Sequence, residues 1–314
     1  TKADEKGHWK LNLPAMPAGG PYILKANDQQ RQDVYVGEVW LCSGQSNMEF
    51  HLDTSLQGTE AAKANTEIRF FQVHYLCGAE PWPDLKHGQW RKFDGTAELK
   101  FSGIAVFFAQ KLYSELKIPI GIIGSYWGGT IAECWTPPEG FAMVPELSLL
   151  RSQFPPINVT GHPTEAMELY NSMIHPLTPY ALRGILWYQG EGNVVQRENY
   201  IYRLQALHRG WKKAFQHPNL PFYIVQLPFF KYGYDSAPER QFSLSRFMAA
   251  QATYADQEEN AHITIITDVS DLDDIHPKNK KPVGERLANQ ALVYEYGYQD
   301  RICDGARVIK ISRE

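Results

Sequence analysis

A short polar stretch follows an apolar run near the start of the chain and contains a candidate nucleophile. Residues 39–42 (VWLC) are apolar, and residues 43–47 continue as SGQSN. Ser46 therefore lies between two side-chain amides at the end of a predicted buried strand. Such a serine could cap the following helix. It could also be a nucleophile, provided that a base elsewhere in the chain removes its proton.

Three further polar clusters follow apolar, strand-like segments. Residues 125–130 (SYWGGT) contain a pair of glycines, and residues 187–193 (WYQGEGN) contain two amides and a carboxylate. The segment after residue 268 carries several aspartates and a histidine. The candidate residues in these clusters are Gly128, Gly129, Gln189, Glu191, Asn193, Asp271, Asp273, Asp274 and His276.

Together, the four clusters hold what acyl transfer to a serine requires. Histidine can accept the serine proton near neutral pH, and a carboxylate orients the imidazole. Backbone N–H groups and a side-chain amide can hold the oxyanion of the tetrahedral intermediate. Ser46 comes first in the chain and His276 last, and the G-x-S-x-G elbow of lipases is absent from the sequence.

Each cluster also has a purely structural interpretation. Ser46 could be only a helix cap, and the pair Gly128-Gly129 only a tight turn. Gln189 and Asn193 could be loop amides bound to backbone, and Glu191 a buried carboxylate paired with an arginine. Asp273 and His276 could be a solvated loop pair. These interpretations explain poorly why all four clusters occur at successive strand ends.

The composition is typical of a globular α/β protein. The chain has 314 residues, 43% of them apolar, with 31 basic and 35 acidic side chains and a net charge of -4. No long basic run is present, so nucleic-acid binding has little support. No apolar stretch approaches the roughly 18 residues needed to span a bilayer. The first ten residues (TKADEKGHWK) lack an apolar signal-peptide core, which leaves the compartment open.

The four cysteines predict neither a zinc site nor a redox pair. They are Cys42, Cys77, Cys134 and Cys303, and none forms a CxxC motif. We expect buried apolar thiols, with one disulfide as an alternative if the protein is exported.

Hydrophobic periodicity predicts alternating strands and helices. The predicted strands cover residues 34–42, 68–75, 118–127, 181–189, 222–227 and 262–268. The predicted helices cover residues 104–117, 201–215, 242–255 and 279–297. This alternation favours a parallel sheet covered on both faces, with the ligand site at the carboxyl ends of its strands. Residues 1–33, with candidate strands at 7–14 and 21–27, are interpreted as the end of an accessory β region, and residues 34–314 as the catalytic domain.

Five blocks of sequence resemble the sialate O-acetylesterase-like group of SGNH-type hydrolases, to which acetylxylan esterases are related. The blocks are VGEVWLCSGQSNMEF, IGIIGSYWGGTIAECW, YNSMIHPL, GILWYQGEGN and DIHPKNKKPVGERLA, in order from about Gly20 to Tyr296. The resemblance implies a flavodoxin-like three-layer α/β/α fold. It also implies deacetylation of O-acetylated sugars without a metal or organic cofactor.

The resemblance also assigns roles at the reaction centre. It implies Ser46 as the nucleophile and His276 as the general base. The oxyanion donors would be the Ser46 N–H, an N–H of Gly128 or Gly129, and the amide of Gln189 or, second, of Asn193. The candidates for the acid that orients His276 are Asp273 first, Asp274 second and Glu191 third.

The remaining matched positions are candidates for the sugar pocket. They are Gln45, Asn47, Trp127, Tyr170, Asn171 and His175, and each could instead only support its neighbours. The expected partner is an O-acetylated carbohydrate, with sialic acid esters first and acetylated xylan as the alternative. A catalytically silent carbohydrate-binding protein is the alternative from another class. By class of reaction, the expected location is periplasmic or secreted.

Overall fold

A central mixed sheet organises the protein in the computed structural model, which describes residues 2–5, 7, 11, 13–62, 65–151, 161–232 and 242–305. Half of the predicted strand at 7–14 lies outside these residues, and the described half (Gly7, Leu11, Leu13 and Pro14) forms no strand. Within the described residues the sheet has the strand order β5-β4-β6-β3-β7-β8-β9. The strands are β3 (Glu38–Gly44), β4 (Asn65–Gln72), β5 (Trp90–Phe93), β6 (Ile120–Tyr126), β7 (Gly184–Tyr188), β8 (Phe222–Val225) and β9 (Ala261–Thr264).

All neighbouring strands in this sheet run parallel except the edge strand β5, which pairs antiparallel with β4. The sequence pattern did not predict β5, because three of its four residues are exposed and show no apolar period. The other six strands were predicted.

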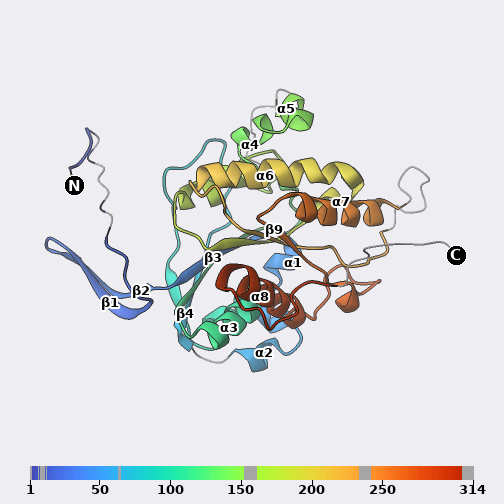
Figure 1. The fold of residues 1–314 in the computed structure, drawn as a ribbon. Helices are drawn as coiled ribbons and strands as arrows, with labels where there is room; N and C mark the ends of the chain where they lie inside the picture. The colour runs from blue at the N-terminus through green and yellow to red at the C-terminus, as the bar shows by residue number, and fades with distance from the viewer. Residues whose placement is uncertain are drawn as a thin grey trace.

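The sheet is covered by helices on both faces, which gives three layers. Helices α3 (Gly103–Leu116) and α8 (Lys281–Tyr296) pack together on one face. Helices α6 (Tyr200–Ala214) and α7 (Ser243–Gln257) pack on the other (Figure 1). The shorter helices are α1 (Ser46–Glu49), α2 (Gly58–Ala61), α4 (Pro138–Ala142) and α5 (Pro145–Arg151). The predicted three-layer α/β/α architecture is confirmed.

The central strand β3 is what delivers Ser46 to the edge of the sheet. Trp40, Leu41 and Cys42 are fully buried, as expected for a strand with helices on both faces. In the register of the sheet, Gly44 lies opposite Tyr126 on β6 and Tyr188 on β7. The carboxyl ends of these three strands therefore meet at one level.

A separate antiparallel hairpin precedes the sheet. Strands β1 (Gly19–Ala26) and β2 (Gln29–Val36) pair only with each other among the described residues, and the hairpin projects from the three-layer body (Figure 1). The expected boundary after residue 33 falls inside β2, which continues to Val36. An accessory role for this region stays a prediction.

Two smaller expectations concern the cysteines and membrane-spanning segments. All four cysteines are free, so the alternative of one disulfide is wrong. Across the described ranges, no helix has both the length and the apolar character needed to cross a bilayer.

Candidate active site

The structure brings Ser46 and His276 into direct contact, although 230 positions separate them in the chain. The Nε2 atom of His276 lies 2.9 Å from the Oγ atom of Ser46. Ser46 is the first residue of α1, directly after β3, and His276 lies in the loop between β9 and α8. This is the contact that a general base needs in order to take the proton of a serine nucleophile.

A glycine makes the sharp exit from β3 that aims Ser46. Gly44 has a φ of +138°, and a Cβ atom there would lie 2.1 Å from the carbonyl oxygen of Tyr188. The next residue, Gln45, donates its backbone N–H to that same carbonyl at 3.0 Å. Only glycine permits this close approach, so the turn that carries Ser46 packs directly against the backbone of β7.

The surroundings of His276 favour its neutral form. Its ring stacks on Phe50, with 6.3 Å between the ring centres. Burial lowers the pKa of His276, and the positive charge of Lys280 lowers it further, while the carboxylate of Asp274 acts in the opposite direction. A neutral imidazole is the form that can accept a proton from Ser46.

The three candidate acids occupy very different positions. Asp273 is exposed and forms an ion pair with Lys231 at 2.9 Å. Asp274 accepts the backbone N–H of His276 at 2.9 Å, and Glu191 accepts the side-chain amide of Asn47 at 2.5 Å. None of these three carboxylates is hydrogen-bonded to the imidazole ring, so the ring contact of a complete triad is not formed here.

The predicted glycine donor lies beside Ser46 but already has a partner. A Cβ atom on Gly128 would be 3.3 Å from the Cβ atom of Ser46. The backbone N–H of Gly128 donates to Oε2 of Glu49 at 2.6 Å. Gly129, with a φ of +75°, makes the turn that follows and is exposed. An oxyanion bound at Gly128 would therefore have to displace the Glu49 carboxylate.

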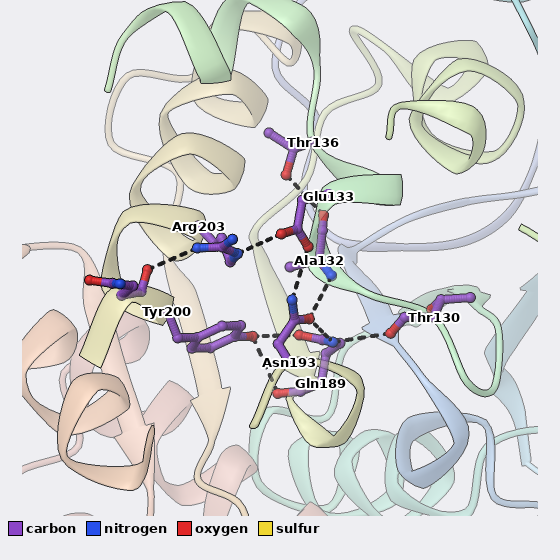
Figure 2. A network of polar contacts seen from close by, with 9 residues as sticks. Thr130, Ala132, Glu133, Thr136, Gln189, Asn193, Tyr200 and Arg203 are labelled. Carbon is purple, nitrogen blue, oxygen red and sulfur yellow. Dashed lines mark hydrogen bonds and ion pairs between the residues drawn. The ribbon is translucent and has the colours of Figure 1, made fainter. Parts of the chain in front are cut away.

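The two candidate oxyanion amides belong to a buried polar network (Figure 2). Nε2 of Gln189 donates to Oδ1 of Asn193 at 2.6 Å, to the Thr130 carbonyl at 3.1 Å and to Oε1 of Gln45 at 3.1 Å. Nδ2 of Asn193 donates to Glu133 at 2.9 Å. An amide from this pair could reach an oxyanion only by giving up one of these bonds.

Two further residues hold the outer end of the same network. Glu133 receives a 2.5 Å hydrogen bond from Nε of Arg203, and Tyr200 donates to Oε1 of Gln189 at 2.6 Å (Figure 2). Glu133 is 7% exposed, and Gln189 and Asn193 are fully buried. We conclude that the network fixes the loop that follows β7.

Aromatic side chains and the carboxylate of Glu49 lie next to Ser46. Trp127, a predicted pocket residue, packs against Tyr75 with 5.1 Å between ring centres and against His162 with 6.2 Å. Tyr75 donates its hydroxyl to Oε1 of Glu49 at 2.8 Å. Burial and the Glu49 carboxylate raise the pKa of Tyr75, so this hydroxyl remains a donor at neutral pH.

Glu49 and Tyr75 were not predicted as site residues from the sequence. Glu49 belongs to the block that carries Ser46, and Tyr75 is the last residue of a predicted strand. No signal in the sequence pairs these two residues, because the contact between them depends on the packing of β4 beside β6.

Three of the predicted pocket residues instead anchor the loop after β4. Nδ2 of Asn171 donates to the carbonyls of Gly78 and Ala79 at 2.9 and 3.1 Å. Nδ1 of His175 lies 2.8 Å from the Trp82 carbonyl, and the buried ring of Tyr170 packs edge-on against His175. These side chains hold the loop that follows Tyr75 in the chain. Direct substrate contact by them stays a prediction.

The two amides that flank Ser46 hold its turn. Oε1 of Gln45 accepts the backbone N–H groups of Gly190 and Gly192 at 3.3 and 3.2 Å. Asn47 is fully buried and receives a hydrogen bond from Lys280, a residue that the sequence analysis did not select. Substrate contact by Gln45 and Asn47 therefore also stays a prediction.

Across the part of the chain that the structure describes, no group of three or more His, Cys, Asp or Glu side chains is arranged to hold a metal ion.

Comparisons with known proteins point to a single family. A family model described as "Carbohydrate esterase, sialic acid-specific acetylesterase" matches residues 36–292. The chain is similar to the sialate O-acetylesterases of Homo sapiens and Mus musculus, with 30% and 28% identity. Each alignment covers 97% of this chain, and respectively 64% and 66% of the relative, so the chain spans somewhat less than two thirds of the length of these curated relatives.

Solved structures agree with this match. The crystal structure of a carbohydrate acetylesterase from Xanthomonas citri is similar, with a TM-score of 0.84 and 33% identity over 95% of this chain and 66% of that one. An Arabidopsis thaliana protein of known structure has a TM-score of 0.50 at 17% identity, covering 82% of this chain and 98% of that one. The second likeness shows the fold alone.

Proposed function

The chain belongs to the sialic acid-specific acetylesterase family of carbohydrate esterases, and from this premise we propose that it removes O-acetyl groups from carbohydrates through an acetyl-enzyme on Ser46. The observation that carries the proposal is the 2.9 Å contact between Oγ of Ser46 and Nε2 of His276. A structural cap would not need a histidine at that atom.

In the proposed first half-reaction, Oγ of Ser46 attacks the acetyl carbonyl carbon while its proton moves to Nε2 of His276. The tetrahedral intermediate collapses when the bond to the sugar oxygen breaks, and that oxygen takes the proton from His276. In the second half-reaction, His276 takes a proton from water, the resulting hydroxide attacks the acetyl group on Ser46, and acetate leaves as the serine regains its proton.

The oxyanion would be held by backbone donors at the turn. The N–H of Ser46 is the first of α1 and has no partner within the helix, and the N–H of Gly128 becomes available once Glu49 moves. The buried amides of Gln189 and Asn193 are less accessible, because their donors are bound in the network. We therefore propose that Ser46 and Gly128 are the main donors.

We propose Asp274 as the acid that supports His276. Its carboxylate accepts the His276 backbone N–H, and its charge is the one that opposes the lowering of the imidazole pKa. Asp273, first by sequence, is exposed and paired with Lys231. In this proposal the Asp274 carboxylate turns toward Nδ1 of His276 during the reaction and so completes a triad.

For the substrate we propose O-acetylated sialic acid first, with acetylated xylan as the alternative. Family membership supports the first choice. Because O-acetylated glycans are met outside the cytoplasm, we propose a periplasmic or secreted location. Acetate release from acetylated sialosides, acetylated xylan and simple acetylated sugars, measured side by side, would rank these substrates.

The reaction itself is tested with a small ester. Wild type, Ser46→Ala and His276→Ala are compared for acetate release from p-nitrophenyl acetate. We expect a loss of about 1000-fold or more in kcat for each variant, as for other serine triads. Near-wild-type turnover by Ser46→Ala would refute the proposed nucleophile.

A further inference from the structure

Lys280 is a buried cation beneath the proposed catalytic pair. It lies at the start of α8, four positions after His276, and is 1% exposed. Its Nζ atom lies 4.7 Å from the centre of the Phe50 ring and 5.6 Å from that of Tyr188. A lysine is rarely buried unless its charge is used or compensated, so this position calls for an explanation.

The Lys280 ammonium donates a hydrogen bond to Oδ1 of Asn47. The NH₂ group of the same amide contacts two loops. Nδ2 of Asn47 donates to the carbonyl of Ile275 at 2.9 Å and to Oε1 of Glu191 at 2.5 Å. Asn47 follows Ser46 in the chain, and Ile275 precedes His276. One amide thus connects the turn of the nucleophile to the loop of the base.

Lys280 and the two acceptors together fix which way this amide faces. An ammonium group can only donate, whereas a carbonyl and an ionised carboxylate can only accept. The oxygen of Asn47 must therefore face Lys280, and its NH₂ group must face Ile275 and Glu191. Without the lysine, the oxygen of Asn47 would lose its donor, and only Ile275 and Glu191 would hold the amide in this orientation.

In the described part of the chain, two charged side chains shift the pKa of His276. Asp274 and Lys280 act on it directly, and Glu191 lies beyond Asn47 with its second oxygen buried and without a partner in the described chain. Tyr188, the remaining titratable neighbour of Lys280, stays neutral because burial raises its pKa. The ion pair of Asp273 with Lys231 lies on the exposed side.

Burial and charge shift the pKa values of His276, Lys280 and Glu191. Lys280 contributes to the lowered pKa of His276, after burial itself. Burial lowers the pKa of Lys280 to about 7, although Glu191 and Asp274 oppose this. Burial also raises the pKa of Glu191. Because His276 titrates below its ordinary pKa of 6.5, Lys280 is largely protonated over the pH range in which His276 changes its charge.

We propose that Lys280 is a positioning residue for the esterase reaction: it locks the Asn47 amide that joins Ser46 to the loop of His276, and its charge holds the imidazole in the neutral, proton-accepting form. This inference rests on the proposed Ser46–His276 chemistry. Lys280 touches neither substrate nor reacting atoms, so its effect is expected in the rate and in its pH dependence.

The test is the pH profile of kcat/KM for p-nitrophenyl acetate with Lys280→Met, which keeps the apolar stem and removes the charge. We expect kcat/KM to fall about 10- to 100-fold, mostly in kcat, because a buried hydrogen bond of a charged group is lost. We also expect the acidic limb to move up by about half a pH unit or more, because a nearby positive charge is gone. Exposed Lys278→Met, in the same loop, is the matched control and should shift neither quantity appreciably.

The outcomes separate this inference from the proposed function. A folded Lys280→Met enzyme with an unmoved acidic limb and a rate within about twofold of wild type would overturn the role of Lys280. If Lys280→Met does not fold, Lys280→Gln keeps a donor without charge and must show the same limb shift. Ser46→Ala and His276→Ala are run in parallel, and activity in those two would refute the reaction itself.

Discussion

The backbone N–H of Gly128 donates to the carboxylate of Glu49 at 2.6 Å, directly beside Ser46. The donor best placed for an oxyanion is thus bound to an anion in the free protein. Tyr75 holds the other carboxylate oxygen at 2.8 Å, so the carboxylate is anchored on both sides. Binding of the tetrahedral intermediate must compete with this contact.

Glu49→Gln should therefore raise kcat for p-nitrophenyl acetate. The substitution keeps the side-chain length and an acceptor for Gly128 but weakens the competing hydrogen bond by about 1 kcal/mol, or several-fold in rate. Steady-state kinetics checks this, with Glu80→Gln, an exposed glutamate in the loop after β4, as the control. A tenfold loss in kcat would show instead that the Glu49 carboxylate assists the reaction.

The pH dependence of the wild-type enzyme should reflect the lowered pKa of His276. Burial and the charge of Lys280 disfavour the imidazolium form, so the base remains neutral below its usual titration range. The acidic limb of kcat/KM should have its midpoint below about pH 6.5, the ordinary value for histidine. A midpoint clearly above that value would contradict this electrostatic description.

The outer end of the amide network should matter mainly for stability. Arg203→Met would leave the buried carboxylate of Glu133 without its ion-pair partner, at a cost of about 3 kcal/mol in the free energy of unfolding. Urea unfolding measures this value. Arg246→Met, which breaks the exposed 4.0 Å contact with Glu198, should cost less than about 1 kcal/mol. Equal costs for the two variants would show that the network adds nothing beyond a surface pair.

Stability should fall on acidification because of a second histidine, His208 in α6. His208 is fully buried between the Tyr254 hydroxyl and the Leu220 carbonyl, and burial lowers its pKa to about 3. Its unfolded pKa is about 6.5, so the unfolded state binds the proton first as the pH falls. The contribution of neutral His208 is complete above pH 6.5 and is lost progressively down to about pH 3.

Urea unfolding of wild type and His208→Gln at pH 7 and pH 5 tests this prediction. Between these values wild type should lose about 2 kcal/mol more than the variant. The variant will be less stable at both values, so the comparison uses the difference between the two pH values. An identical pH dependence in both proteins would exclude His208 as the source.

The sequence was most informative where one residue type serves one chemical role. Ser46 and His276 were predicted as partners, and the structure places Oγ of Ser46 2.9 Å from Nε2 of His276. Six sheet strands and the helices α3, α6, α7 and α8 followed from apolar periodicity, because each packs one face or both against the core.

What the sequence could not show depends on packing between distant segments. The aspartates at 271–274 are equivalent as residue types, and only the loop geometry separates exposed Asp273 from Asp274 at the backbone of His276. Lys280 was overlooked because a lysine near a helix start normally faces solvent. Its burial requires the Phe50 and Tyr188 rings, which come from two other parts of the chain.

The central claim is that Ser46 carries the acetyl group. The most direct measurement is mass spectrometry of the protein quenched within the first turnovers of p-nitrophenyl acetate, followed by peptide mapping. We predict one added acetyl group in wild type, located on Ser46 and absent from Ser46→Ala. An acetyl group on another residue, or full turnover by Ser46→Ala without any adduct, would contradict the proposed mechanism.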